Sequence, residues 1–295
     1  MSWFTEFPQL DRYQLLSIRK TLDEGFREFT RAYGDAIEHF FDPLLVFLIG
    51  FEKLLLASPW WLVIGVILSI THFAARSVRL TIGVAIALIL IGVFGMWEDT
   101  MRTLSMITVC TLLSIVVGVP VGIAMSRSNR AQSIITPVLD VMQTMPAFVY
   151  LIPVVMLLGI GRIPGVIAVV IYAIPPVIRL TNLGIRLVDE DVLEAADAYG
   201  VTPWQRLWNV QLPLAMPNIM AGVNQTIMMA LAMVVIASMI GVKGLGQPVL
   251  QSITNQYFTQ GLMNGLAIVV IAIIFDRVSQ AYAKRSQQQF RGRDD

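Results

Sequence analysis

The chain has 295 residues, of which 56% are hydrophobic and 14% are charged, and its mean hydropathy is +0.70. This balance excludes an ordinary soluble domain and is typical of a membrane protein. The 21 basic and 20 acidic residues leave a formal net charge of +1, so we expect no nucleic-acid partner. The single cysteine, Cys110, lies in an apolar run and excludes an intrachain disulfide.

The amino-terminal region, residues 1–57, is polar and amphipathic. Its first 37 residues carry mixed charges instead of a short basic start and an apolar core, so we expect no cleavable signal peptide. An apolar piece at 40–56 is interrupted by Asp42, Pro43, Glu52 and Lys53. We expect an interfacial helix there, and an additional membrane span remains the alternative.

Seven apolar segments follow, each close to the roughly 20 residues that cross a bilayer core. They predict an all-α polytopic membrane protein with about seven transmembrane helices, or eight if 40–56 also crosses. The segments are 60–75, 80–97, 104–125, 134–158, 163–180, 215–241 and 262–277.

Lysine and arginine placement predicts the orientation, because cytoplasmic loops carry the excess of basic residues. The loops after alternate segments are basic and should be cytoplasmic, together with the carboxy-terminal tail. Their residues are Arg76, Arg79, Arg127, Arg130, Arg179, Arg186, Arg277, Lys284, Arg285, Arg291 and Arg293. The opposite loops hold only Arg102, Arg162 and Lys243.

Several polar residues and helix breaks lie inside the predicted spans. Such groups are tolerated where they face protein or a water-filled cavity. Their clustering on neighbouring spans favours a translocation path, although interhelical hydrogen bonds would explain each residue alone, and packing would explain the aromatic ones. The candidate path residues are Gln143, Thr144, Pro146, Phe148, Tyr150, Asn224 and Gln225.

Asp140 lies within the predicted span 134–158, where an unpaired charge is costly. Arg179, at the cytoplasmic end of the next, antiparallel span, can reach the same depth. We predict a structural ion pair between Asp140 and Arg179, with substrate contact as the alternative.

A polar hairpin at 194–213 lies between two apolar spans. Acidic residues at 190–194 suit the positive end of a short helix, and Gly200 can take the positive φ that ends it. Thr202, Pro203 and Gln205 then match a capping box that begins a second helix. We expect Leu212 and Pro213 to close this second helix.

The same hairpin resembles the EAA loop of ABC importer permeases, in which EAA, a glycine and an aliphatic-x-Leu-Pro group recur at fixed spacings. The matching residues are Glu194, Ala195, Ala196, Asp197, Gly200, Val210, Leu212 and Pro213, and Val210 stands where the family most often has Ile. The resemblance implies a coupling helix that docks on a cytoplasmic ATPase, and hence a type I importer permease fold.

A narrower resemblance, carried by the runs 140–153, 174–179 and 224–228, is to permeases of the glycine betaine/proline betaine class. It covers roughly residues 95–280 and implies a permease core at 98–280, peripheral transmembrane helices at 58–97 and a cytoplasmic basic tail at 281–295. It also implies a bacterial inner-membrane location and import of quaternary amines such as betaines, choline or trimethylamine N-oxide. The implied partners are a second copy of the chain, a cytoplasmic ATPase dimer, an extracytoplasmic binding protein and membrane lipids.

Other function classes fit the sequence less well. The two histidines lie far apart, and there is no metalloprotease, serine-hydrolase or Walker motif, so we expect no catalytic residue and no metal site. We expect no bound cofactor either, since ATP and Mg would sit on the partner ATPase. An ABC permease for another solute, such as an amino acid, remains the main alternative, ahead of a channel or a secondary transporter.

Overall fold

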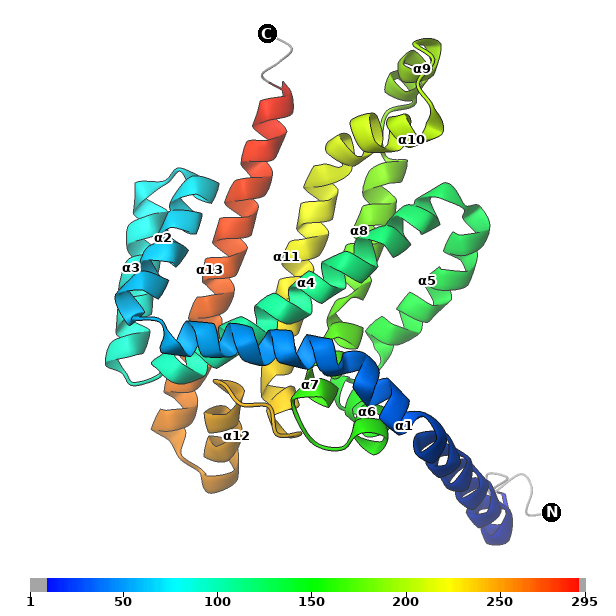
Figure 1. Ribbon diagram of the computed structural model, residues 1–295, viewed down its shortest axis with the longest axis vertical. Coiled ribbons are helices and arrows are strands. Elements are labelled where there is room, and N and C mark those ends of the chain that lie inside the picture. The colour runs from blue at the N-terminus through cyan, green and yellow to red at the C-terminus, as the bar shows by residue number, and fades with distance from the viewer. Residues whose placement is uncertain (1–9, 292–295) are drawn as a thin grey trace, which may run out of the picture.

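The computed structural model describes residues 10–291, with the side chains of 283–291 left out. Its described residues form helices and turns, without a β-strand, which confirms the all-helical prediction. The predicted tail 281–295 falls largely outside the described side chains. A long helix lies across a bundle of helices (Figure 1). The long helix is α1 (Arg12–Ala57), and the bundle includes α4 (Trp97–Arg127), α8 (Pro175–Arg186), α11 (Leu212–Ser238) and α13 (Phe258–Arg291).

Helix α1 (Arg12–Ala57) covers the predicted interfacial piece at 40–56 and passes through Pro43 without ending. Its carboxy-terminal part packs on the bundle through Leu48, which is buried in the main core. It meets α2 (Trp60–Ala75) at a bend of 110°, so α1 crosses the direction of the spans instead of extending one. This arrangement agrees with an interfacial helix.

Helices α2 and α3 (Val78–Val93) form a peripheral antiparallel pair beside α13 (Phe258–Arg291). Both have 16 residues, which is short for a bilayer core of about 30 Å at the helical rise of 1.5 Å per residue. By length and composition, four helical segments of the described chain can span a membrane, or up to six if each bent pair is one span. The longest of these segments runs from Pro203 to Ser238.

The core is built by α4 (Trp97–Arg127), α7 (Arg162–Ala173), α8 (Pro175–Arg186) and α11 (Leu212–Ser238). Helices α4 and α8 touch where α4 carries glycine, since a Cβ on Gly122 would lie 2.7 Å from the carbonyl oxygen of Ile178. Gly222 of α11 similarly lies against Val177, with 3.0 Å between an added Cβ and the Cα. Only residues without a side chain permit these close crossings.

The predicted span at 134–158 is not one straight helix. It is divided into α5 (Asn129–Thr144), a short 3₁₀ turn (Ala147–Tyr150) and α6 (Leu151–Leu158), and the two parts are bent by 110°. Met145 is extended because it precedes Pro146, which disfavours helical geometry in the preceding residue. Pro146 also has no N–H to donate to the carbonyl of Met142, and the Tyr150 hydroxyl donates there instead.

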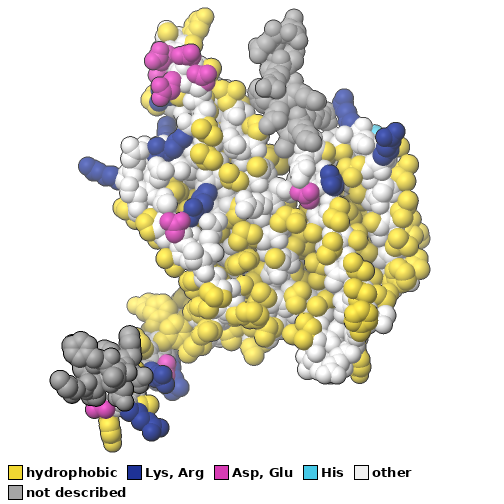
Figure 2. All heavy atoms as spheres, turned by 180° about the vertical axis from the view of Figure 1, so that it is seen from behind, with side chains coloured by type: hydrophobic (Ala, Val, Ile, Leu, Met, Phe, Trp, Pro, Cys, Tyr) yellow, Lys and Arg dark blue, Asp and Glu magenta, His cyan; other side chains and the backbone are white. Residues whose placement is uncertain are grey.

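The two ends of the bundle differ in the elements that they carry. The hairpin formed by α9 (Glu190–Ala198) and α10 (Pro203–Arg206) stands at one end, and α12 (Gly246–Asn255) lies at the other (Figure 1). The α2–α3 and α4–α5 connections lie at the hairpin end, as the predicted alternation of basic loops requires. Figure 2 shows a broad hydrophobic band between these ends.

Candidate coupling hairpin and translocation path

The turn of the hairpin has the geometry that its sequence predicts. Gly200 has φ +75°, its N–H donates to the carbonyl of Asp197, and the N–H of Val201 donates to that of Ala196. These two bonds form a Schellman motif, which satisfies the carbonyl groups at the end of α9. Nothing lies within 4 Å of a Cβ added to Gly200, so the backbone angle, and not the space, requires glycine.

The second arm of the hairpin is held by its predicted capping box. The Thr202 side chain accepts from the N–H of Gln205, and the Gln205 side chain accepts from the N–H of Thr202. An ion pair of 2.7 Å between Arg206 and Asp197 then joins α10 to α9. The hairpin is therefore a fixed shape and not a loose loop.

Most of the hairpin surface is free in the single chain. Glu194, Ala195 and Asp197 are exposed, and α9 has no buried residue. Three aromatic side chains are also exposed: Tyr199 (89%), Trp204 (62%) and Trp208 (51%). The tip gathers acidic side chains, as Figure 2 shows. An exposed aromatic surface on a rigid turn is typical of a docking surface.

The hairpin does not end where the sequence predicts. Leu212 and Pro213 do not close the second helix, because the chain continues through a π turn (Leu207–Gln211) directly into α11. Pro213 stands in the first turn of α11, where the widened π turn accommodates a residue without an N–H. Leu207 and Leu212 are buried with Ile185 of α8, and this cluster anchors the hairpin to the bundle.

The Asp140–Arg179 pair is present in the structure. A guanidinium nitrogen of Arg179 contacts a carboxylate oxygen of Asp140 and joins α5 to α8. The Asp140 side chain is 57% exposed, so the pair lies on an open face of the single chain.

The other path candidates on this segment fall into two groups. Gln143, Thr144, Pro146 and Phe148 are exposed around the bend between α5 and α6. Tyr150 is 5% exposed, and its ring lies 6.0 Å from that of Tyr172. Tyr150 thus holds the bend together, whereas the exposed four remain candidates for a path.

The two candidates on α11 point in different directions. Gln225 is exposed. The Asn224 amide instead donates to Asp276 of α13, at 2.8 Å, and accepts from Ser279, at 2.6 Å. The structure therefore places Asn224 in the seam between α11 and α13, which the sequence reasoning missed. The signal available was Asp276, a lone acidic residue within the predicted last span.

No cluster of three or more His, Cys, Asp or Glu side chains able to hold a metal ion occurs among residues 10–282. The features that stand out are the exposed, rigid hairpin at one end of the bundle and the exposed polar groups along α5 and α11. This combination suits a gated membrane path driven from one side.

Comparisons with known proteins give the family. The protein-family model described as binding-protein-dependent transport system inner membrane component matches residues 114–288. A glycine betaine/carnitine transport permease protein of Listeria monocytogenes is 48% identical over 237 residues, which are 79% of this chain and 84% of the relative.

Two further relatives are similar over most of the chain. A glycine betaine/proline betaine permease protein of Escherichia coli is 48% identical, with 84% of this chain and 70% of the relative covered. A glycine betaine permease protein of Bacillus subtilis is 41% identical, with 92% and 96% covered.

The solved structures agree on the fold. The MetNI methionine ABC transporter has a chain that matches with a TM-score of 0.57 at 19% identity, covering 63% of this chain and 93% of that one. The chain therefore belongs to the family of binding-protein-dependent transport system inner membrane components, the permease subunits of ABC transporters.

Proposed function

We propose that this chain is the permease of an ATP-driven importer for quaternary ammonium compounds of the glycine betaine class. The similar relatives are named as permeases for glycine betaine, proline betaine and carnitine, and a more distant one for trimethylamine N-oxide. These compounds share a methylated nitrogen that carries a positive charge. This nitrogen has no N–H and therefore cannot donate a hydrogen bond. A permease for another small solute is the alternative.

The hairpin is the observation that carries the coupling part of the proposal. In our reading it faces the cytoplasm and docks in a cleft of an ATPase subunit. Tyr199 and Trp204 would fill the cleft, because exposed aromatic side chains supply much of the binding energy at interfaces. The acidic tip would then favour a basic rim on the ATPase.

A second copy of the chain would complete the path. The chain has one hairpin, whereas two ATPase subunits need two, and the closed two-fold is the commonest oligomer symmetry. The exposed face of α5, with the Asp140–Arg179 pair and Gln143, and the exposed side of α11 at Gln225 would then lie toward the two-fold axis. ATP binding would draw the hairpins together and open the path to the outside, where a binding protein delivers the substrate.

The test is reconstitution of the purified complex. The tagged chain should co-purify from its native membrane with an ATPase and should contain two permease copies per complex. In proteoliposomes with its binding protein it should take up glycine betaine or a related methylated amine when ATP is supplied. Uptake without ATP would contradict the importer, and selective uptake of an unmethylated amino acid would contradict the substrate class.

A further inference from the structure

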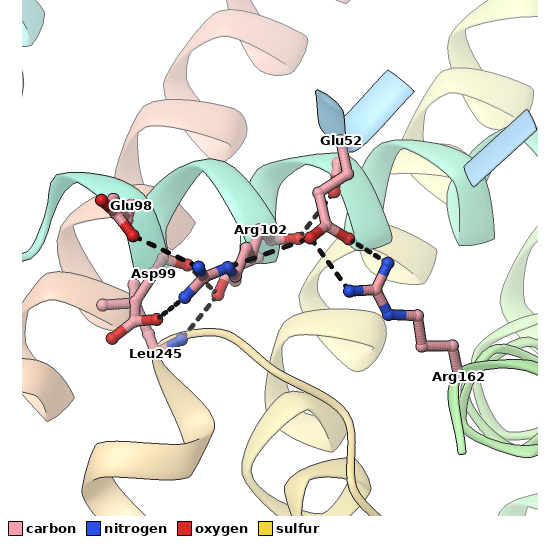
Figure 3. A network of polar contacts seen from close by, with 8 residues as sticks. Glu52, Glu98, Asp99, Arg102, Arg162 and Leu245 are labelled. Atoms are coloured by element: carbon pink, nitrogen blue, oxygen red, sulfur yellow. Dashed lines mark hydrogen bonds and ion pairs between the residues drawn. The ribbon is translucent and has the colours of Figure 1, made fainter. Parts of the chain in front are cut away.

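A nearly buried carboxylate of α1 lies between two arginines from different helices. The Glu52 side chain is only 13% exposed, and its two oxygens lie 2.9 and 3.2 Å from the guanidinium of Arg162 on α7. One of these oxygens also lies 3.9 Å from Nε of Arg102 on α4. Figure 3 shows Glu52 pointing between the two arginines.

The two arginines depend on this partner to different degrees. Arg162 is the first residue of α7, where the positive end of the helix disfavours a basic side chain. Arg102 is shared, since it also pairs with Glu98, at 3.2 Å, and Asp99, at 2.9 Å, on its own helix. Glu52 is the one group in this network that connects Arg162 to α4.

The same end of α4 also holds the connection between α11 and α12. The hydroxyl of Thr103 accepts from the N–H of Leu245, at 2.8 Å, and donates to the carbonyl of Asp99 (Figure 3). Leu245 is fully buried, and a Cβ on Gly244 would lie 2.6 Å from that hydroxyl. The fit is therefore close on this side of α4 as well.

Little space remains between these elements. The cavity bounded by Glu52, Arg102, Arg162 and Lys243 has a volume of about 10 Å³, roughly the room of one water molecule. Because Glu52 is only 13% exposed and Arg162 has no other ion-pair partner in this network, removing the carboxylate leaves the Arg162 charge uncompensated, which is more disruptive than losing a fully exposed pair.

We propose that Glu52 is a positioning residue that makes α1 a fixed strap across the ends of α4 and α7 distant from the hairpin. The strap keeps these ends together throughout the transport cycle, so that the path opens between two copies of the chain and not within one copy. This inference rests on the proposed importer function, but the tie itself is a property of the single chain.

The first experiment neutralises the carboxylate. Glu52→Gln should lower uptake per ATP hydrolysed about tenfold, because it leaves Arg162 without its carboxylate partner, and should speed amide hydrogen exchange at 44–56 and at the start of α7. The matched control is Glu24→Gln on the same helix, since Glu24 pairs with Lys20 on a surface where both side chains are more than half exposed. That control should change neither quantity.

The second experiment replaces the ion pair by a covalent bridge. Glu52→Cys with Arg162→Cys should lose coupling, and a short bismaleimide should restore it by rejoining α1 and α7. The native Cys110 is fully buried and should not react. Restored uptake supports a tie that stays closed, whereas a bridged protein that hydrolyses ATP without uptake would overturn it.

The role of Glu52 and the importer function can be tested separately. Unbridged variants with normal uptake and normal exchange would overturn the role of Glu52. If the wild-type complex itself shows no ATP-driven uptake, the importer function fails. Hydrogen exchange in Glu52→Gln still decides the tie in that case, and unchanged exchange would overturn it.

Discussion

The most direct perturbation of the proposed coupling is Gly200→Val in the hairpin turn. Gly200 has φ +75° and open space around its Cα, so the substitution changes the backbone preference without a steric clash. Left-handed geometry costs an ordinary L-residue about 1–2 kcal/mol, and a β-branched side chain is at the unfavourable end. An energy of that size changes a two-state ratio roughly 5- to 30-fold.

We therefore expect ATPase co-purification and ATP-driven uptake to fall by about this factor, while membrane insertion is unchanged. The matched control is Gly95→Val, because Gly95 has φ +76°, also has nothing within 4 Å, and lies in the α3–α4 turn away from the hairpin. Gly200→Asn should recover most of the loss, since asparagine tolerates this backbone region. Equal uptake by the Gly200→Val and Gly95→Val proteins would refute the coupling role of the turn.

Three other predictions follow from the contacts within the bundle. Charge reversal at Asp140 or at Arg179 should each impair uptake, and reversal of both should restore it; without rescue in the double variant, the pair has no structural role. Tyr150→Phe should lower the thermal midpoint and leave the substrate preference unchanged, because it frees the carbonyl of Met142 without altering the exposed face of α5. Gly122→Val should destabilise the protein by about 1–3 kcal/mol or more, since α4 and α8 must separate, and detergent-solubilised unfolding curves that match the wild type would contradict this packing.

The hairpin could be predicted from the sequence because its determinants are local. A capping box, a glycine with positive φ and an acidic first turn act over three or four residues, and Gly200, Thr202 and Gln205 adopt the predicted geometry. The Asp140–Arg179 pair could also be predicted from the sequence. The prediction needs only that the two segments are antiparallel neighbours and that an unpaired charge in a span is costly.

The remaining features depend on long-range packing. Glu52 meets Arg162 across 110 positions of sequence, and Asn224 meets Asp276 across 52, so neither contact can be read from spacing. The sharpness of the bend at Pro146 could not be predicted for a different reason. An apolar segment with a proline can continue as a kinked helix or turn sharply, and the hydroxyl of Tyr150 stabilises the sharp turn here.

The continuity of the hairpin with α11 bears on how the two ends of the molecule communicate. The segment from Pro203 to Ser238 has 36 residues and is helical throughout, so at 1.5 Å per residue its length along the helix is about 54 Å. A hairpin closed off at Leu212 could move independently, whereas this one must tilt α11 when it moves. Helices α8 and α11 are in close contact at Gly184 and Gly222, where there is no room for a side chain. We therefore expect the two helices to move together.

The effect of this tilt depends on whether the helices are fixed to one another at the end of the bundle opposite the hairpin. Beyond Ser238 the chain turns at Gly241 and is tied to α4 through the Leu245–Thr103 hydrogen bond. Helix α4 is in turn connected to α7 through Glu52. When the hairpin is displaced, the opposite end of the bundle is held in place by these contacts. The exposed face of α5 and α11 lies outside these contacts and is the part that can move. Motion should therefore concentrate at that face, which is where a path between two copies would open.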